Sequence, residues 1–228
     1  MIVPIRDENT LIILDEILEK FQGLMLETNL DYFVEETVEP PTESYCQSDA
    51  LDLTRDLYGY PLEYRYITLN KLSSNLENWN KYNSWFRTKI VPQLGMLETA
   101  SFSYYPPEGF VGWHTNDNNV SHQLLFTWSE NGDGYFRYYD NKTKKIITQP
   151  DKKGWQCKSL FFGAKNKPLW HCCYTKGPRL TFAVKLKGKY LNDQHKKIII
   201  DWRDCIISEI SGEHNHNHTN SIDDRKIK

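Results

Sequence analysis

The sequence has no long hydrophobic run and almost no net charge. No stretch approaches the roughly 18 consecutive apolar residues that a membrane span needs. Its first residues, MIVPIRDENTLIIL, are acidic and mixed in polarity, unlike a signal or transit peptide. The 28 Lys and Arg nearly balance the 30 Asp and Glu, so there is no strong signal for nucleic-acid binding. We therefore expect no membrane partner, and the overall charge gives no strong sign of a nucleic-acid partner, although it leaves a local basic groove open.

Cysteine is scarce and irregularly spaced. The five cysteines are odd in number and follow neither a disulfide framework nor a zinc-site spacing. Free thiols are typical of reducing compartments, so we expect a cytoplasmic protein. Aromatic residues, in contrast, make up 14% of the chain, a composition that favours β-strands and pockets lined by rings over a helical bundle.

The first part of the chain, residues 1–96, has mainly helical spacing. A helix is predicted at 7–22, ended by Gly23, and helical spacing returns at 70–94. Alternating aromatic and β-branched residues predict a strand at 62–69. The intervening stretch 30–57, with Pro40-Pro41, indicates a long loop, either an ordinary surface excursion or a lid.

Residues 97–190 change to short alternating segments separated by turn signals such as SENGDG at 129–134. No helical pattern lies between these segments, which argues against a parallel α/β sheet and favours an α+β, mainly β fold, either a sandwich or a jelly-roll barrel. The preceding helices would cover one outer face. The eight predicted strands are 97–105, 110–116, 121–128, 134–140, 144–149, 155–162, 168–174 and 179–187.

Two shorter regions follow. Residues 191–212 contain KKIIIDW, which indicates an edge strand or another packing segment. Residues 213–228 are polar and of low complexity, so we expect disorder. The histidines of this tail, His214, His216 and His218, would bind a transition metal only adventitiously.

Five residues in two distant stretches form a candidate site. On a strand, His114 and Asn116 face one side while Thr115 faces the other, and His171 lies in another predicted strand. Two histidines with a third ligand on one face suit non-haem Fe(II). Beyond them, Arg179 and Thr181 share a face and form a good clamp for a carboxylate.

A tyrosine and several neighbouring residues are further candidates. Tyr105 would donate its phenol to the same ligand. His122 is a candidate to support the metal ligands, although a buried hydrogen-bonding role is the simpler interpretation. Cys172 and Cys173 would lie in the barrel wall as small hydrophobic residues. One strand face carries Tyr135, Arg137 and Tyr139, which would contact substrate or pack as half-buried sheet residues.

With these residues in this order, the sequence resembles the Fe(II)- and 2-oxoglutarate-dependent oxygenases, especially the prolyl-hydroxylase-like branch, and it is also similar to phage-encoded members. The resemblance implies a double-stranded β-helix, a jelly-roll or cupin-like barrel. It implies that His114 and His171 bind Fe(II), and that Arg179, Thr181 and Tyr105 bind the co-substrate 2-oxoglutarate. The implied reaction is hydroxylation of a C–H bond of a peptide or small molecule, with release of succinate and with ascorbate in support.

The sequence departs from the family pattern at the third metal ligand. Asn116 stands where the family has Asp or Glu, and Asp117 follows one position later, so either would be the third ligand. Some family members, the aspartyl/asparaginyl β-hydroxylases, act with two histidines and no carboxylate. The spacing of eight from His171 to Arg179 is also shorter than is common in the family. The alternative is a jelly-roll binding module that keeps a ligand pocket without turnover.

Overall fold

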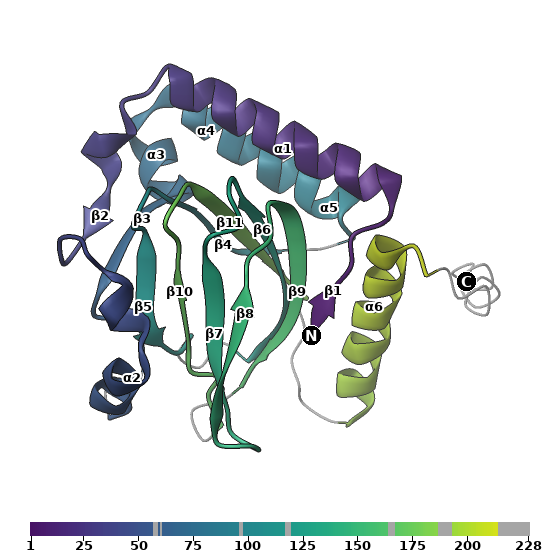
Figure 1. The fold of residues 1–228 in the computed structure, drawn as a ribbon. Coiled ribbons are helices and arrows are strands. Elements are labelled where there is room, and N and C mark those ends of the chain that lie inside the picture. Colours follow the sequence, from purple (N-terminus) through teal and green to yellow (C-terminus); the bar gives the residue numbers. More distant parts are fainter. Residues whose placement is uncertain are drawn as a thin grey trace, which may run out of the picture.

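The computed structural model describes residues 1–56, 59, 61–95, 98–116, 120–163, 167–186 and 193–213. Eight antiparallel strands form its centre (Figure 1). All eight predicted strands are present, with bounds within three residues of those expected. They are β4 (Glu98–Tyr105), β5 (Phe110–His114), β6 (Ser121–Ser129), β7 (Tyr135–Asp140), β8 (Lys145–Pro150), β9 (Gly154–Phe162), β10 (His171–Tyr174) and β11 (Arg179–Lys185).

The order of these strands decides between the two predicted architectures. Four of them form a major sheet in the order β9-β6-β11-β4, and four form a minor sheet in the order β5-β10-β7-β8. Apart from the β7–β8 hairpin, which lies within the minor sheet, successive strands along the chain alternate between two facing sheets, as in a jelly roll. The fold is a double-stranded β-helix. Strand β3 (Tyr64–Thr68) pairs with both β4 and β5 and joins the sheets along one side.

Alternation along each strand gives the major sheet two different faces. On β11, Leu180, Phe182 and Val184 are at most 1% exposed and pack under the helices. The residues between them, such as Thr181, face the interior of the barrel. Helices α1 (Glu8–Leu26) and α4 (Glu77–Trp85) cover the outer face (Figure 1), as predicted.

Helix α1 continues past the predicted stop at Gly23. Asp7 caps its start by accepting a hydrogen bond from the Thr10 backbone N–H at 2.7 Å. At the other end, the Glu27 N–H donates to the carbonyl groups of Leu24 and Met25. A single glycine lowers helix stability by only about 1 kcal/mol, so Gly23 does not end a helix that packs along one face.

The predicted helix at 70–94 is divided into four parts. Leu76 has an extended conformation, with φ −132° and ψ 124°, and it separates α3 (Leu69–Asn75) from α4. A π-helical turn (Phe86–Ile90) and the short α5 (Val91–Gln93) follow. The periodicity predicted the buried face correctly but not this break, because Leu76 itself suits either conformation.

Residues 30–56 pack against two parts of the barrel, the core under the helices through Leu30, Phe33 and Val34 and the outside of the minor sheet through residues such as Cys46 and Leu51. They form two 3-10 turns (Leu30–Phe33 and Glu43–Cys46), β2 (Glu35–Glu36) and α2 (Ser48–Thr54). The Cys46 thiol lies 3.4 Å from the Cys173 carbonyl oxygen, and the Trp113 indole N–H donates to the Gln47 carbonyl at 2.8 Å. The second half of this stretch therefore covers the minor sheet, and α2 within it departs from the predicted loop.

The segment after the barrel is a helix, so the edge-strand interpretation of KKIIIDW is wrong. Helix α6 (Asp193–Ser211) buries Ile199, Ile206 and Ile210, whose spacing is helical, and it lies beside β1 (Ile2–Val3) in Figure 1. The predicted tail, with His214, His216 and His218, lies outside the described residues. Within the described part of the chain, no helix combines the length and apolar content needed to cross a bilayer.

Two leucines of α1 provide a test of the helix-to-sheet packing. Leu14 is fully buried, whereas Leu26, at the end of the same helix, is 91% exposed. Leu14→Ala should lower the free energy of unfolding by about 2–5 kcal/mol because it leaves a cavity. Leu26→Ala should change it by less than about 0.5 kcal/mol. Urea unfolding measures both, and equal effects would contradict this packing.

Candidate active site

A cavity of about 590 Å³ lies between the two sheets. It has aromatic walls formed by Tyr66, Phe136 and Phe162 and polar positions that include Ser103 and Gln123. All the predicted site residues within the described part of the chain line this cavity. These are Tyr105, His114, Asn116, His171, Arg179 and Thr181.

An irregularity between β5 and β10 brings His114 into the cavity. His171 is the pairing partner of His114 and Cys173 is the partner of Val111, so two residues of β5 oppose the single residue Cys172. Such a β-bulge reverses the alternation of side chains. Val111 and His114 therefore both line the cavity, although a regular strand would place them on opposite faces.

Both histidines are held in the form that a metal requires. Their rings lie with centroids 4.0 Å apart. The Nδ1 atom of His114 lies 2.9 Å from the Gly112 carbonyl oxygen, and that of His171 lies 2.9 Å from the Leu169 carbonyl oxygen. Because each carbonyl requires a proton on Nδ1, the lone pair is on Nε2. Each ring thus keeps one unprotonated nitrogen as a ligand.

The surroundings of the pair favour neutral imidazole. Burial lowers the pKa of His114 to about 4, against the opposing effect of its hydrogen bond to Gly112. Burial, followed by the neighbouring His114, lowers the pKa of His171 well below its usual value. Neutral imidazole is the form that coordinates a metal.

The third metal ligand is the weakest part of the site. Asn116 lines the cavity with the two histidines. Thr115 is only 1% exposed, so it does not reach solvent, and its backbone N–H donates to the Gly59 carbonyl at 2.9 Å. Asp117 lies outside the described residues. Among the residues described, no group of three or more His, Cys, Asp or Glu side chains is placed to hold a metal ion.

Arg179 presents an unpaired guanidinium fork to the cavity. Its side chain is 1% exposed, and its Nε donates to Asp151 Oδ2 at 2.8 Å. Its Nη1 and Nη2 are buried and have no hydrogen-bond partner among the residues that the structure describes. Burial opposes its charge, but Asp151 more than offsets this and raises the pKa of Arg179. Two unpaired N–H-bearing nitrogens are what a carboxylate would bind.

Tyr105 and Thr181 lie beside this fork. The Tyr105 ring centroid is 5.2 Å from the central guanidinium carbon of Arg179, a cation–π contact. Thr181 also lines the cavity, and its hydroxyl lies 3.4 Å from that of Thr127. Tyr105 therefore contacts the guanidinium, and Thr181 lines the same cavity.

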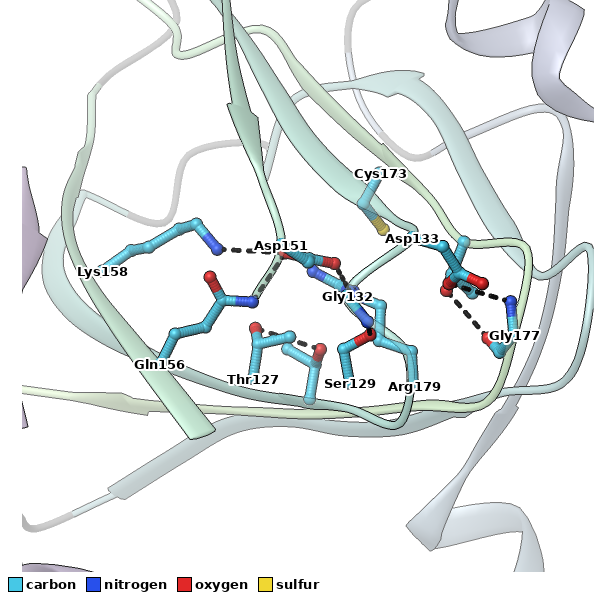
Figure 2. Close-up of polar contacts among 12 residues, drawn as sticks. Thr127, Ser129, Gly132, Asp133, Asp151, Gln156, Lys158, Cys173, Gly177 and Arg179 are labelled. Carbon is cyan, nitrogen blue, oxygen red and sulfur yellow. Dashed lines mark hydrogen bonds and ion pairs between the residues drawn. The ribbon is translucent and has the colours of Figure 1, made fainter. Parts of the chain in front are cut away.

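No sequence motif indicated the residues that hold Arg179 in place. Asp151 lies between Arg179 and Lys158, with Lys158 Nζ 3.3 Å from its Oδ1, and the Gln156 amide donates to the same oxygen at 2.9 Å (Figure 2). Gln156 and Lys158 share a face of β9 with the cavity-lining Phe162. The available signal was a lysine on a strand face that is otherwise uncharged.

The remaining candidates lie away from the cavity or in its wall. Arg137 packs over the Tyr135 ring on the outer side of the minor sheet and donates to the Cys46 carbonyl at 2.8 Å, so this face does not contact the cavity. His122 packs against Phe161, with centroids 4.7 Å apart, and is absent from the cavity lining among described residues. Cys172 and Cys173 are both buried in the wall, as expected.

No family model and no curated protein match the sequence. Similar solved structures include a Pseudomonas putida prolyl-4-hydroxylase (12% identity, TM-score 0.31, covering 72% of this chain and 99% of that one). Another is a 2OG-Fe(II) oxygenase family oxidoreductase from Burkholderia pseudomallei (8% identity, TM-score 0.36, covering 60% of this chain and 76% of that one). A third is Drosophila melanogaster CENP-C bound to CAL1, with 7% identity and a TM-score of 0.27. This match covers 38% of this chain and 62% of that one. Likeness at these TM-scores assigns neither a family nor an activity.

The depressed histidine pKa values predict a loss of stability in acid. Below pH 6.5 the unfolded chain gains protons that the folded pair does not, so stability falls as the pH decreases toward about 4. His114 alone should contribute on the order of 2 kcal/mol between pH 7 and pH 5. Urea unfolding of the metal-free protein at both pH values measures the loss.

The control is the double variant His114→Gln/His171→Gln, which should lose less stability over the same range. His122, whose pKa burial also lowers to about 4, is present in both proteins and does not affect the difference. An unchanged pH dependence would contradict the neutral, buried state of the pair.

Proposed function

We propose that this protein is a non-haem oxygenase that uses Fe(II) and 2-oxoglutarate to hydroxylate a C–H bond of its substrate, with release of succinate and carbon dioxide. One observation supports this proposal above the others. The same cavity contains two imidazoles, each with its Nδ1 at a backbone carbonyl, and a buried guanidinium fork with two nitrogens that are unpaired among the described residues. The two imidazoles suit a metal, and the two unpaired guanidinium nitrogens suit a carboxylate.

The donors present fit an Fe(II) site based on two histidines. His114 and His171 would hold the metal through Nε2, and Asn116 would add its amide oxygen as a weaker ligand than a carboxylate. The Gly112 and Leu169 carbonyls keep both rings in the required tautomer. When bound, the metal supplies the activation of dioxygen that no protein side chain can perform.

The chain itself would bind and orient the co-substrate. Arg179 would receive the distal carboxylate of 2-oxoglutarate in a bidentate pair of hydrogen bonds, with Thr181 and Tyr105 beside it. The histidines come from the minor sheet and Arg179 comes from the major sheet, so the molecule would lie across the barrel interior. The aromatic walls would limit access of water to the site.

The cavity also constrains the substrate. Arg179 is the one lining residue with a formal charge among those described, when the histidines are neutral. A peptide side chain or a small molecule with an uncharged reacting portion would fit the remaining aromatic walls. We also propose a reducing, cytoplasmic setting, which is supported by the five free cysteines.

The activity can be tested without the natural substrate. With Fe(II), ascorbate and 2-oxoglutarate, the protein should slowly release succinate by uncoupled turnover. Arg179→Lys keeps the charge beside Asp151 but loses the planar fork, so it should weaken 2-oxoglutarate binding by about tenfold or more while metal binding is retained. The exposed Arg87 provides a matched control, and Arg87→Lys should bind normally. Anaerobic calorimetry measures the binding of Fe(II) and of 2-oxoglutarate.

A binding module without turnover is the second candidate, and it rests on Asn116, an amide where a carboxylate ligand would be expected. Such a protein would bind 2-oxoglutarate or another carboxylate through Arg179 but release no succinate. Failure to bind both Fe(II) and 2-oxoglutarate under anaerobic conditions would reject the oxygenase.

The third ligand can be tested by restoring a carboxylate. Asn116→Asp should tighten Fe(II) binding by at least about tenfold, because a carboxylate is a better ligand for this ion than an amide. Asp117→Ala should have little effect. Metal titration of both variants measures the change, and a large loss on Asp117→Ala with no gain on Asn116→Asp would identify Asp117 as the ligand.

A further inference from the structure

Lys158 is a second buried cation behind the guanidinium fork. Its side chain is 1% exposed, and Asp151, whose side chain is fully buried, lies between it and Arg179. Lysine is almost never so deeply buried unless its charge is paired. A single Asp151 carboxylate here serves two cations, so the three groups have a net charge of +1.

The way in which Asp151 is used leaves the fork with a defined orientation. Its Oδ2 accepts from Nε of Arg179, so the side edge of the guanidinium is occupied. Nη1 and Nη2, at the end of the guanidinium, are left unpaired. Meanwhile Oδ1 is held by Gln156 and Lys158 (Figure 2). An incoming carboxylate can therefore form only the end-on pair of hydrogen bonds.

We propose that Lys158 is a specificity-determining residue that selects ligands with an anionic distal end, through its charge and without touching them. The inference rests on the proposed function, since it concerns the same co-substrate site. Lys158 does not line the cavity, whereas Arg179 does. Its effect is to cancel the charge of Asp151, so that Arg179 keeps an uncompensated positive charge for the ligand.

The net charge around Asp151 distinguishes this role from a structural one. Without Lys158, Asp151 and Arg179 form a neutral pair, and a ligand carboxylate would be buried with no net attraction and close to another carboxylate. With Lys158, the carboxylate completes a buried cluster of two positive and two negative charges. Burial lowers the pKa of Lys158 and the Asp151 carboxylate opposes this. A bound anion would further favour the charged amine.

The test is a charge cycle on the Fe(II)-loaded protein under anaerobic conditions. Lys158→Met gives a net charge of zero, Asp151→Asn gives +2, and the double variant returns to +1. The amide oxygen introduced by Asp151→Asn can still accept a hydrogen bond from Arg179. Two ligands are compared by calorimetry. They are 2-oxoglutarate and 2-oxovalerate, which keeps the 2-oxo acid end but has an uncharged distal end.

Lys158→Met should weaken 2-oxoglutarate binding by about tenfold or more and change 2-oxovalerate binding by less than about twofold. The double variant should recover 2-oxoglutarate affinity to within about threefold of the wild type. Asp151→Asn should bind 2-oxoglutarate more tightly than the double variant, because its net charge is higher by one. If Lys158→Met alone does not fold, tighter binding by Asp151→Asn than by the double variant tests the same charge effect.

A purely structural Lys158 gives a different result. Both ligands would then weaken together, or the double variant would remain as weak as Lys158→Met, and either outcome would overturn the inference. Thermal unfolding identifies misfolded variants, and Lys145→Met on the exposed β8 serves as the control for loss of a lysine. If the wild-type protein binds neither 2-oxo acid, the proposed function itself fails. Normal 2-oxoglutarate binding by Lys158→Met rejects only the role of Lys158.

Discussion

A buried carboxylate cannot remain unpaired in the interior of a protein, and this constraint determines one end of the cavity. Asp151 is held by Arg179, Lys158 and Gln156, which come from two different strands of the major sheet. The network fixes the guanidinium without using the two nitrogens at its end. The ligand-binding capacity of Arg179 therefore depends on residues that lie outside the cavity.

The strand alternation makes this arrangement compatible with a stable fold. One face of the major sheet supplies Phe102, Phe126 and Phe182 to the core under α1 and α4, with ring centroids 5.0–5.8 Å apart. The opposite face takes no part in that core, so its residues can be polar. Ser103 and Thr181 lie there, directly paired across β4 and β11. Stability and ligand binding thus use opposite faces of the same strands.

The predictable features of this protein were those with a local cause. Eight strands follow from alternation and turn residues, and the grouping of His114, His171 and Arg179 in one cavity agrees with the order of these residues along the chain. Other features depend on non-local packing. The bulge opposite Cys172 reverses the side-chain alternation of β5, and it depends on the pairing of β5 with β10. The ion pair between Asp151 and Lys158 joins residues seven positions apart, and no local pattern indicates it. The isoleucines of α6 suited a strand as well as a helix until their partners were known.

The location of the two halves of the site on different sheets has a mechanical consequence. His114 and His171 belong to the minor sheet, whereas Arg179 belongs to the major sheet, and β3 joins the two along one side. A ligand that contacts both halves would connect the two sheets across the interior of the barrel. Any motion that separates the sheets would then stretch the bound molecule. Ligand affinity and the stiffness of the barrel would therefore be coupled, because a ligand that binds both sheets stabilises the state in which they are held together.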